Sequence, residues 1–272
     1  MNYLQFSFDL ESQPEQERMV ALLSEQGFEG FEENGHILDA FIAEQNFDEK
    51  GFSTVIESFS KVSYTTTVIE NINWNQQWEE SFEPVVVEDF VAVRAAFHAP
   101  IRNVRYEIII TPKMSFGTGH HATTHLMMNE MQHIDFAGKS VLDFGTGTGI
   151  LAILATKLGA SDVLAIDCDE WSIANSKENV EQNSCDNITI VQKDNIPVSK
   201  KVDIILANIN LNVLVANMDS IAEVLKPKGD ILLSGFLKEN EPAIVAALQN
   251  AGLKFFSNAQ RGEWLIVIAK NG

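Results

Sequence analysis

A glycine-rich segment in the second half of the chain has the residue types of a ligand-binding turn. Residues 141–149 read VLDFGTGTG, so Gly145, Gly147 and Gly149 follow directly on an apolar run. Glycine permits a tight turn and lets the backbone approach a ligand with no Cβ in the way. A plain connection between a strand and a helix would show the same glycines, so the segment indicates a binding site only together with other residues.

Asp167 provides the second indication of a ligand. It ends the next apolar segment, VLAID at 163–167, and lies 22 residues after Gly145. In doubly wound folds, an acid at this place accepts hydrogen bonds from ribose hydroxyls. The spacing G-x-G-x-G differs from the dinucleotide fingerprint G-x-G-x-x-G, and Asp143 would repel a phosphate but suit a cation. The pattern predicts an adenosine-type ligand, with an NAD-binding dehydrogenase as the alternative.

Asn208 ends a later apolar segment, VDIILAN at 202–208. Ligands of a doubly wound sheet lie outside the carboxyl ends of its strands, which places Asn208 beside the ligand. Its side-chain oxygen, with the backbone carbonyl of Ile209, can accept N–H bonds from a substrate amine. Asn208 can also cap the helix that follows, and the two roles are compatible.

Three histidines, His120, His121 and His125, lie in the segment FGTGHHATTH at 116–125. The last two are four residues apart and can share a helix face. No acidic cluster or cysteine completes a ligand set, so we expect no metal, and we expect His121 to line the site rather than act as a base. The two cysteines, Cys168 and Cys185, form no Cys-x-x-Cys pair and are expected to be reduced thiols.

Alternating strand-like and helix-like segments position these residues. They predict a doubly wound, Rossmann-like α/β sheet with parallel strands. The strands are expected at 141–144, 163–167, 188–192, 202–208, 231–236, 255–259 and 264–270. The helices between them are expected at 150–158, 170–183, 211–225 and 239–250. The last two strands are expected to form a hairpin, which makes one strand antiparallel.

The first quarter of the chain has a different pattern. Strand-like segments at 3–8, 28–31, 36–42 and 62–72 and helix-like segments at 14–26 and 47–59 predict a small α+β domain of ferredoxin-like architecture. Residues 73–84, NWNQQWEESFEP, have few aliphatic side chains and are expected to be a linker. The predicted domains are therefore 1–72 and 85–272, with 85–120 as lead-in strands and loop.

The charge balance limits the classes of partner. The 272 residues contain 19 Lys and Arg against 38 Asp and Glu, a net charge of −19. Residues 1–70 contain 14 acidic and 3 basic side chains. A broad basic face for nucleic acid is excluded, and a basic partner is favoured. The start of the chain shows no signal peptide and no apolar run approaches the roughly 20 residues of a membrane span, so a cytoplasmic protein is expected.

Together these motifs resemble the class I S-adenosylmethionine-dependent methyltransferases. The segments FGTGHHATT, LDFGTGTGILAI, AIDCD and ANI, in this order and spacing, are similar to those of the PrmA family, the methyltransferases of ribosomal protein L11. The resemblance covers about residues 74–272, whereas residues 1–70 match mainly in size and architecture. Ala122 and Glu170 depart from the family pattern, which often has proline at these two turns.

The resemblance implies a function and a cofactor. The cofactor is S-adenosylmethionine, and the substrates are lysine side chains and the N-terminal α-amine of L11, which the first domain recognises. Another amine-directed or small-molecule methyltransferase, or a non-catalytic ribosome-associated binding protein, remains an alternative. A monomer without a nucleic-acid or membrane partner is expected, and whether L11 is methylated free of the ribosome stays open.

The resemblance also assigns roles to residues of these motifs. Asn208 would position the acceptor amine, with the Ile209 carbonyl. The main cofactor contacts would be Thr124, Gly145, Asp167 and Asn208. Further candidate contacts are Phe116, Thr118, Gly119, His121, Asp143, Gly147 and Gly149.

Overall fold

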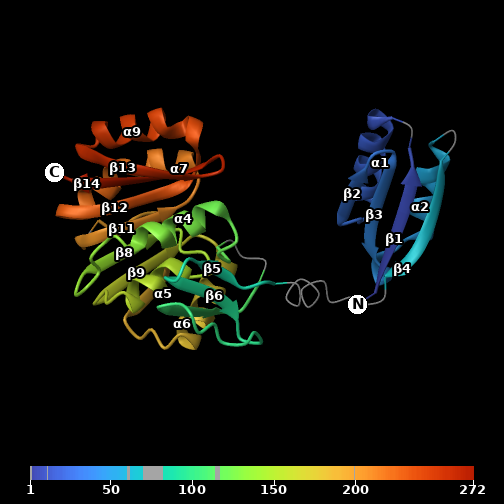
Figure 1. Ribbon diagram of the computed structural model, residues 1–272. Coiled ribbons are helices and arrows are strands. Elements are labelled where there is room, and N and C mark those ends of the chain that lie inside the picture. Colours follow the sequence, from blue (N-terminus) through green and yellow to red (C-terminus); the bar gives the residue numbers. More distant parts are fainter. Residues whose placement is uncertain (1, 11, 60–61, 70–81, 114–116, 199) are drawn as a thin grey trace. The chain divides into compact units, whose positions relative to one another are not determined.

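The computed structural model describes residues 2–10, 12–59, 62–69, 82–113, 117–198 and 200–272. The chain divides into two compact units, Met1–Glu80 and Ser81–Gly272 (Figure 1). Of the predicted linker at 73–84, all but the last three positions lie outside the described residues, as does Phe116. The domain boundaries at 72 and 85 therefore stay predictions.

The first unit contains a four-stranded antiparallel sheet and two α-helices. Its elements are β1 (Tyr3–Asp9), α1 (Gln13–Glu25), β2 (Gly30–Asn34), β3 (Ile37–Ala43), the short 3-10 helix η1 (Glu44–Asn46), α2 (Glu49–Glu57) and β4 (Ser63–Ile69). The strand order is β2-β3-β1-β4, and each neighbouring pair is antiparallel. This βαββαβ arrangement confirms the predicted ferredoxin-like architecture.

One face of this small sheet packs on the helices. Along β1, Phe6 and Phe8 are buried, whereas Gln5 and Ser7 on the other face are half-exposed. This period of two is typical of a sheet with one covered face. The ring of Phe6 lies 4.5 Å, centroid to centroid, from that of Phe52 on α2. The core of the first unit is therefore largely aromatic.

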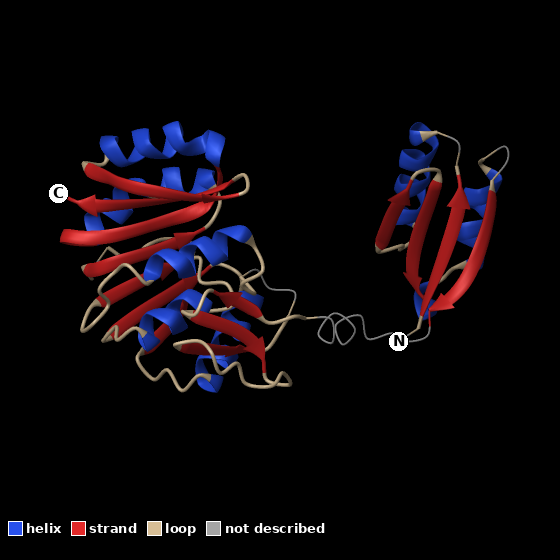
Figure 2. Cartoon of the chain, viewed as in Figure 1, coloured by secondary structure: helices blue, strands red, loops and turns tan. Residues whose placement is uncertain are grey.

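The second unit is built on a seven-stranded sheet (Figure 2). Its strands are β8 (Ser140–Phe144), β9 (Asp162–Asp167), β10 (Ile188–Gln192), β11 (Val202–Asn208), β12 (Leu225–Leu237), β13 (Leu253–Arg261) and β14 (Trp264–Asn271). The order is β10-β9-β8-β11-β12-β14-β13, and β14 runs antiparallel to both neighbours while the other pairs are parallel. The predicted doubly wound sheet with a terminal hairpin is confirmed.

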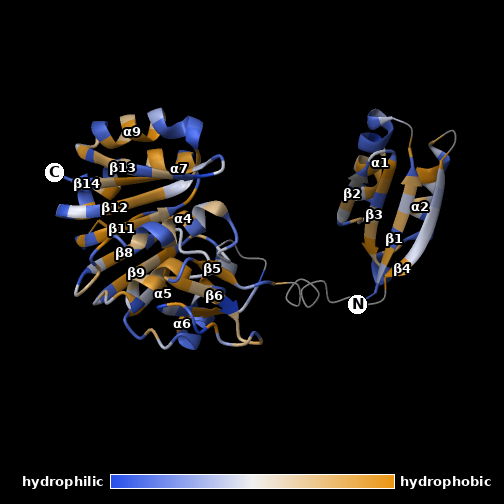
Figure 3. Ribbon diagram, in the orientation of Figure 1, coloured by the Kyte–Doolittle hydropathy of each residue, from blue (hydrophilic) through white to orange (hydrophobic). Residues whose placement is uncertain are grey.

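Helices cover both faces of the large sheet. They are α4 (Ala122–Met131), α5 (Ile150–Lys157) and α6 (Glu170–Gln182) on one face, and α7 (Leu211–Ala216), α8 (Met218–Val224) and α9 (Glu241–Asn250), preceded by the 3-10 helix η2 (Lys238–Asn240), on the other. Along β11, Ile204 and Leu206 belong to the first core, and Ile205 and Ala207 belong to the second. Burial on both sides explains the nearly continuous apolar strands (Figure 3).

A three-stranded sheet occupies part of the predicted lead-in region. It consists of β5 (Val85–Val87), β6 (Val91–Ala95) and β7 (Tyr106–Ile110), in the order β5-β6-β7. Asn179 of α6 and Asn183 at its C-terminal end connect β7 and the residue after it to the rest of the second unit. The Ile109 amide donates to Asn183 Oδ1 at 3.1 Å, and the Thr111 amide donates to Asn179 Oδ1 at 2.8 Å. These bonds fix the start of the segment that leads to α4.

The prediction of one helix over 211–225 is wrong. The segment forms α7 and α8, which meet at Asn217, a residue with φ −103° and ψ 6°. The Asn217 side-chain amide donates to the Val213 carbonyl at 2.9 Å. Asparagine competes with the helix for backbone partners in this way, and a pattern of apolar residues does not reveal it.

Two further findings concern the whole described chain. Both cysteines are unpaired, Cys168 exposed and Cys185 buried, which confirms the expected free thiols. In the part of the chain that the structure describes, no helix is both long enough and apolar enough to cross a membrane.

Candidate active site

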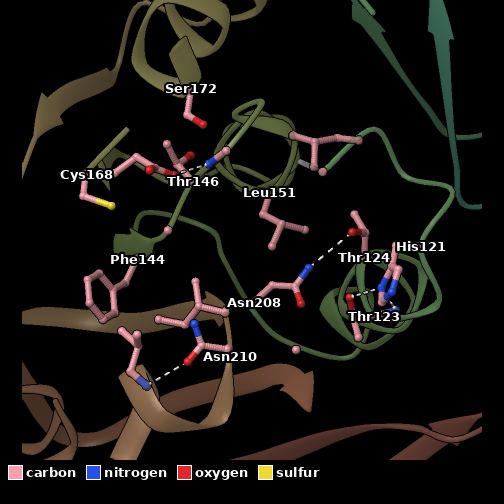
Figure 4. Close-up of a pocket in the computed structure, with 18 of the residues that line it drawn as sticks. His121, Thr123, Thr124, Phe144, Thr146, Leu151, Cys168, Ser172, Asn208 and Asn210 are labelled. Carbon is pink, nitrogen blue, oxygen red and sulfur yellow. Dashed lines mark hydrogen bonds between the residues drawn. The ribbon is translucent and has the colours of Figure 1, made fainter. Parts of the chain in front are cut away.

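A cavity of about 550 Å³ opens at the carboxyl ends of β8, β9 and β11 (Figure 4). These strands end at Phe144, Asp167 and Asn208, and all three residues line the cavity. Parallel sheets bind their ligands at this edge. The volume lies within the range of sites that bind small molecules and cofactors. The predicted binding edge and the cavity therefore coincide.

The glycine turn and Asp167 form one hydrogen-bonded unit. The Gly147 amide donates to Asp167 Oδ2 at 2.9 Å, and the Asp169 amide donates to Oδ1 at 3.0 Å. Gly145 has φ +77°, a left-handed conformation that favours glycine. Because a carboxylate oxygen accepts about two hydrogen bonds, each oxygen of Asp167 keeps acceptor capacity for hydroxyl groups of a ligand.

Asn208 presents an unpaired acceptor in the cavity. Its Nδ2 donates to Thr124 Oγ1, on α4, at 3.2 Å (Figure 4). Its Oδ1 is buried and has no hydrogen-bond partner among the described residues. A buried acceptor without a partner costs free energy, so this oxygen is suited to an N–H donor of a ligand.

The helix-capping role considered for Asn208 belongs to Asn210. Asn210 Oδ1 accepts the Val213 amide at 3.1 Å and is the N-cap of α7. Asn208 is therefore not needed at the helix start.

The comparisons with known proteins agree with this geometry. The family model described as "Ribosomal protein L11 methyltransferase (PrmA)" matches residues 8–272. The chain belongs to this family. Proteins named Ribosomal protein L11 methyltransferase from Phocaeicola vulgatus and Porphyromonas gingivalis are 37% and 38% identical to it, over 98% and 97% of this chain and 98% and 96% of theirs. The crystal structure of a ribosomal protein L11 methylase from Lactobacillus delbrueckii subsp. bulgaricus has a TM-score of 0.65 and 27% identity, covering 70% of this chain and 99% of that one.

Membership of the PrmA family makes the protein an S-adenosylmethionine-dependent methyltransferase. The residues of the cavity fit this cofactor. The carboxylate of Asp167 and the unpaired oxygen of Asn208 are both acceptors, which suits a ligand with ribose hydroxyls and a positive charge. No dinucleotide phosphate has to be bound, in keeping with the G-x-G-x-G spacing.

Asp143, expected at the cofactor, does not line the cavity of this PrmA-family protein. It is fully buried on the face of β8 next to α5, where Oδ2 accepts from Thr146 Oγ1 at 2.6 Å. Burial raises the pKa of Asp143 to about 7, the Thr146 hydrogen bond opposes that shift, and the charge of Asp167 adds to it. Through this hydrogen bond Asp143 holds Thr146 in the glycine turn, and Asp143 itself does not line the cavity.

The segment before α4 packs against the glycine turn. Thr148 Oγ1 donates to the Gly117 carbonyl at 2.6 Å. His121 is the N-cap of α4, and its Nδ1 lies 2.8 Å from Thr123 Oγ1. The His121 ring contacts that of Trp264 edge-on, with centroids 4.4 Å apart, and both side chains line the cavity. His121 is thus a lining residue, as expected.

Several predicted contacts lie next to the cavity rather than in its lining. Thr118 Oγ1 lies 3.2 Å from His120 Nδ1, and Gly119 lies against Val85. Gly149 has φ +83° and is the N-cap of α5. Among the described residues, no group of three His, Cys, Asp or Glu side chains is arranged as a metal site.

Fourteen of the 21 lining residues were not among the predicted site residues, and four of them come from β10, β12 and β14 or the residues that follow. Lys193 and Asp194 follow β10, so the rule of carboxyl strand ends was sufficient to find them. Trp264 begins β14, and because that strand is antiparallel its first residue lies at the same edge. Gly235 lies within β12, and no sequence signal indicates it.

Proposed function

We propose that this protein transfers methyl groups from S-adenosylmethionine to lysine side chains and the N-terminal α-amine of ribosomal protein L11. The names of the PrmA-family relatives support L11 as the substrate. The observation that carries an amine substrate is the buried, unpaired Oδ1 of Asn208 at the cavity. A hydrogen-bond acceptor at this place favours a substrate group that carries N–H bonds.

The main obstacle to the reaction is the proton on the amine. A lysine with a pKa near 10.4 is almost fully protonated at pH 7, and an α-amine near 7.7–8.0 is less so. Transfer into a cavity shielded from water lowers the pKa of an amine. After its proton has left to solvent, the neutral amine would donate N–H bonds to Asn208 Oδ1 and the Ile209 carbonyl, which would keep its lone pair free to accept the methyl group. S-adenosylmethionine would supply that methyl on an activated sulfonium and leave as the neutral thioether S-adenosylhomocysteine while the amine takes the positive charge, so positioning provides much of the rate.

The remaining cavity residues would bind the cofactor. Asp167 would accept the ribose hydroxyls, and Gly145 and Gly147 would let the turn approach the ligand. Thr124 lies in the first turn of α4, where free backbone N–H groups favour a carboxylate such as that of the methionine end. Thr124 also orients Asn208 through its hydroxyl. One helix start thus serves both the cofactor and the acceptor.

The first unit would recognise the protein substrate. Its excess of carboxylates favours a lysine-bearing partner and speeds the encounter at low salt. The net charge of −19 favours a protein over a nucleic acid as partner. We propose a monomer that acts in the cytoplasm.

The test uses purified L11 and methyl-labelled S-adenosylmethionine. L11 is supplied unmodified, with only its lysines acetylated, with only its α-amine acetylated, or with both classes of amine acetylated. Mass spectrometry of wild-type reactions is expected to show label on lysines and on the N-terminus, with each class lost only when that class is blocked. Undiminished label on L11 with both classes blocked would contradict amine methylation.

A further inference from the structure

Ile209, the residue after Asn208, lies between two glycines. Gly145 belongs to the turn after β8 and Gly235 to β12, and all three residues line the cavity. Both glycines have positive φ values, +77° and +97°. The two contacts with Ile209 are chemically different, and that difference can be tested.

Gly235 contacts the backbone of Ile209. A Cβ at Gly235 would lie 2.3 Å from the Ile209 carbonyl oxygen, 2.6 Å from its carbonyl carbon and 2.8 Å from its amide nitrogen. Carbon–oxygen contacts in proteins are about 3.3 Å or more. Backbone atoms cannot rotate aside, so any larger residue at 235 must displace the Ile209 peptide by roughly 1 Å.

Gly145 contacts the side chain of Ile209. A Cβ at Gly145 would lie 2.2 Å from Ile209 Cγ2 but 3.6 Å from Ile209 Cβ. This clash depends on the branched side chain and would disappear with alanine at 209.

The sheet explains why Gly235 reaches this place. Ser234 lies opposite Asn208 in the parallel pairing of β12 with β11, and its carbonyl accepts the Ile209 amide at 3.1 Å. Ser234 Oγ donates to the Leu265 carbonyl at 2.8 Å. The pairing of β12 with β14 is irregular at this point, and such irregularities redirect a strand. The end of β11 is thus fixed in place by β12.

We propose that Gly235 is a positioning residue for methyl transfer and forms, with Gly145, a two-glycine seat for Ile209. The seat sets where the Asn208 side chain and the Ile209 carbonyl meet the acceptor amine. This inference rests on the proposed function, since the position of this segment matters only if it receives an amine. A misplacement of about 1 Å in a reacting geometry lowers the rate roughly 100-fold.

The first experiment compares Gly235→Ala with Gly252→Ala. Gly252 also has positive φ, +76°, but a Cβ there would meet nothing within 4 Å, so this control reproduces the backbone strain without the contact. Gly235→Ala is expected to lower kcat for L11 about 100-fold, with cofactor affinity within about twofold of wild type, whereas Gly252→Ala keeps kcat. A wild-type kcat in Gly235→Ala, or an equal loss in both variants, would overturn the proposal.

A second set of variants separates the two contacts. Adding Ile209→Ala to Gly145→Ala is expected to raise kcat above that of Gly145→Ala alone, because the clash is with Cγ2. Adding Ile209→Ala to Gly235→Ala is expected to give no gain, because that clash is with the backbone. If Gly235→Ala does not fold, the Gly145 pair decides, and absence of rescue there overturns the seat.

A crystal structure of Gly235→Ala provides a readout that does not depend on the substrate. The Ile209 carbonyl oxygen is expected to move by about 1 Å from its wild-type position. An Ile209 carbonyl oxygen that stays in its wild-type position would overturn the proposal, whatever the activity of the variant on L11. A wild-type protein that labels no amine would instead overturn the proposed function and leave the displacement of Ile209 as a separate result.

Discussion

The four-stranded sheet of the first unit and the seven-stranded sheet of the second have different burial patterns. In the first unit, β1 alternates between the buried Phe6 and Phe8 and the half-exposed Gln5 and Ser7. In the second unit, five of the seven residues of β11 are apolar and buried on one face or the other, and the strand ends at Asn208. A sheet covered on both faces leaves its strand ends for a ligand, whereas a sheet covered on one face leaves a broad surface. We infer that the second unit carries out the chemistry and that the first unit recognises the substrate.

The open face of the first unit has the charge for such a surface. The residues of β1 and β3 that point away from the helices include Ser7, Asp9, Asp39 and Phe41, and the Ser7 hydroxyl donates to Asp39. No lysine or arginine occurs in β1, β2 or β3. The second unit, in contrast, places the hydrogen-bond acceptors Asp167 and Asn208 in one cavity.

The largest effect is expected from Asn208→Ala. Loss of the unpaired Asn208 Oδ1 should lower kcat about 10²–10³-fold, by analogy with the removal of one preorganised hydrogen-bonding group in other active sites. Cofactor affinity is expected to change far less. Labelled-methyl kinetics and calorimetric titration of the cofactor measure the two quantities. An unchanged kcat would mean that the acceptor is positioned elsewhere.

The second-largest effect is expected on the pH dependence of stability, and it should be confined to the second unit. The unfolded chain ionises Asp143 near pH 3.9, whereas burial raises the pKa of Asp143 in the folded state to about 7. Between these values the folded state keeps a proton that the unfolded state has lost, so stability falls as pH rises from about 4 to 7. Asp143→Asn removes this dependence.

The variant is therefore expected to gain roughly 3 kcal/mol more, relative to wild type, at pH 8 than at pH 5. Burial also lowers the pKa of His125, which acts in the opposite direction, but this contribution cancels in the difference. Urea unfolding of the second unit at both pH values measures the gain. An equal gain at pH 5 and pH 8 would contradict a raised pKa, and the unfolding of the first unit should not change.

A smaller effect is expected from Asp167→Ala. Removal of a charged acceptor for the ribose should weaken cofactor binding by about 1–3 kcal/mol. Asp162→Ala is the control, because Asp162 lies at the other end of β9 and pairs with Lys200 at the surface. Titration calorimetry is expected to show a loss for Asp167→Ala alone. Equal affinities in the two variants would remove Asp167 from the cofactor site.

The smallest effect concerns the first unit. Replacement of Glu25, Glu29 and Glu32, all exposed, by glutamine should raise KM for L11 a few-fold at low salt without changing kcat, because surface charge acts mainly on encounter. The matched control replaces three exposed acids of the second unit, Asp219, Glu223 and Glu239, by their amides. If both triple variants raised KM equally, the acidity of the first unit would have no special role.

The sequence was sufficient to predict both folds and the edge of the sheet where the cavity lies. Strand periodicity placed Asp167 and Asn208 at strand ends, and the structure shows both residues lining one cavity. The sequence could not predict that Asp143 is buried beside the glycine turn instead of lining the cavity. The side chains of β8 alternate between the two faces of the sheet, and of this strand only Phe144 lines the cavity. Gly235 depends on an irregular pairing between β12 and β14, which local patterns do not encode.

The most direct test of the division between chemistry and recognition is a labelling experiment with a mixture of substrates. The full-length protein is incubated with methyl-labelled S-adenosylmethionine and the total ribosomal proteins of the same organism, and the products are read by mass spectrometry. We expect label on L11 alone, on lysines and on its N-terminal amine. Label spread over many lysine-bearing ribosomal proteins would contradict it, because the cavity would then act without selection by the first unit.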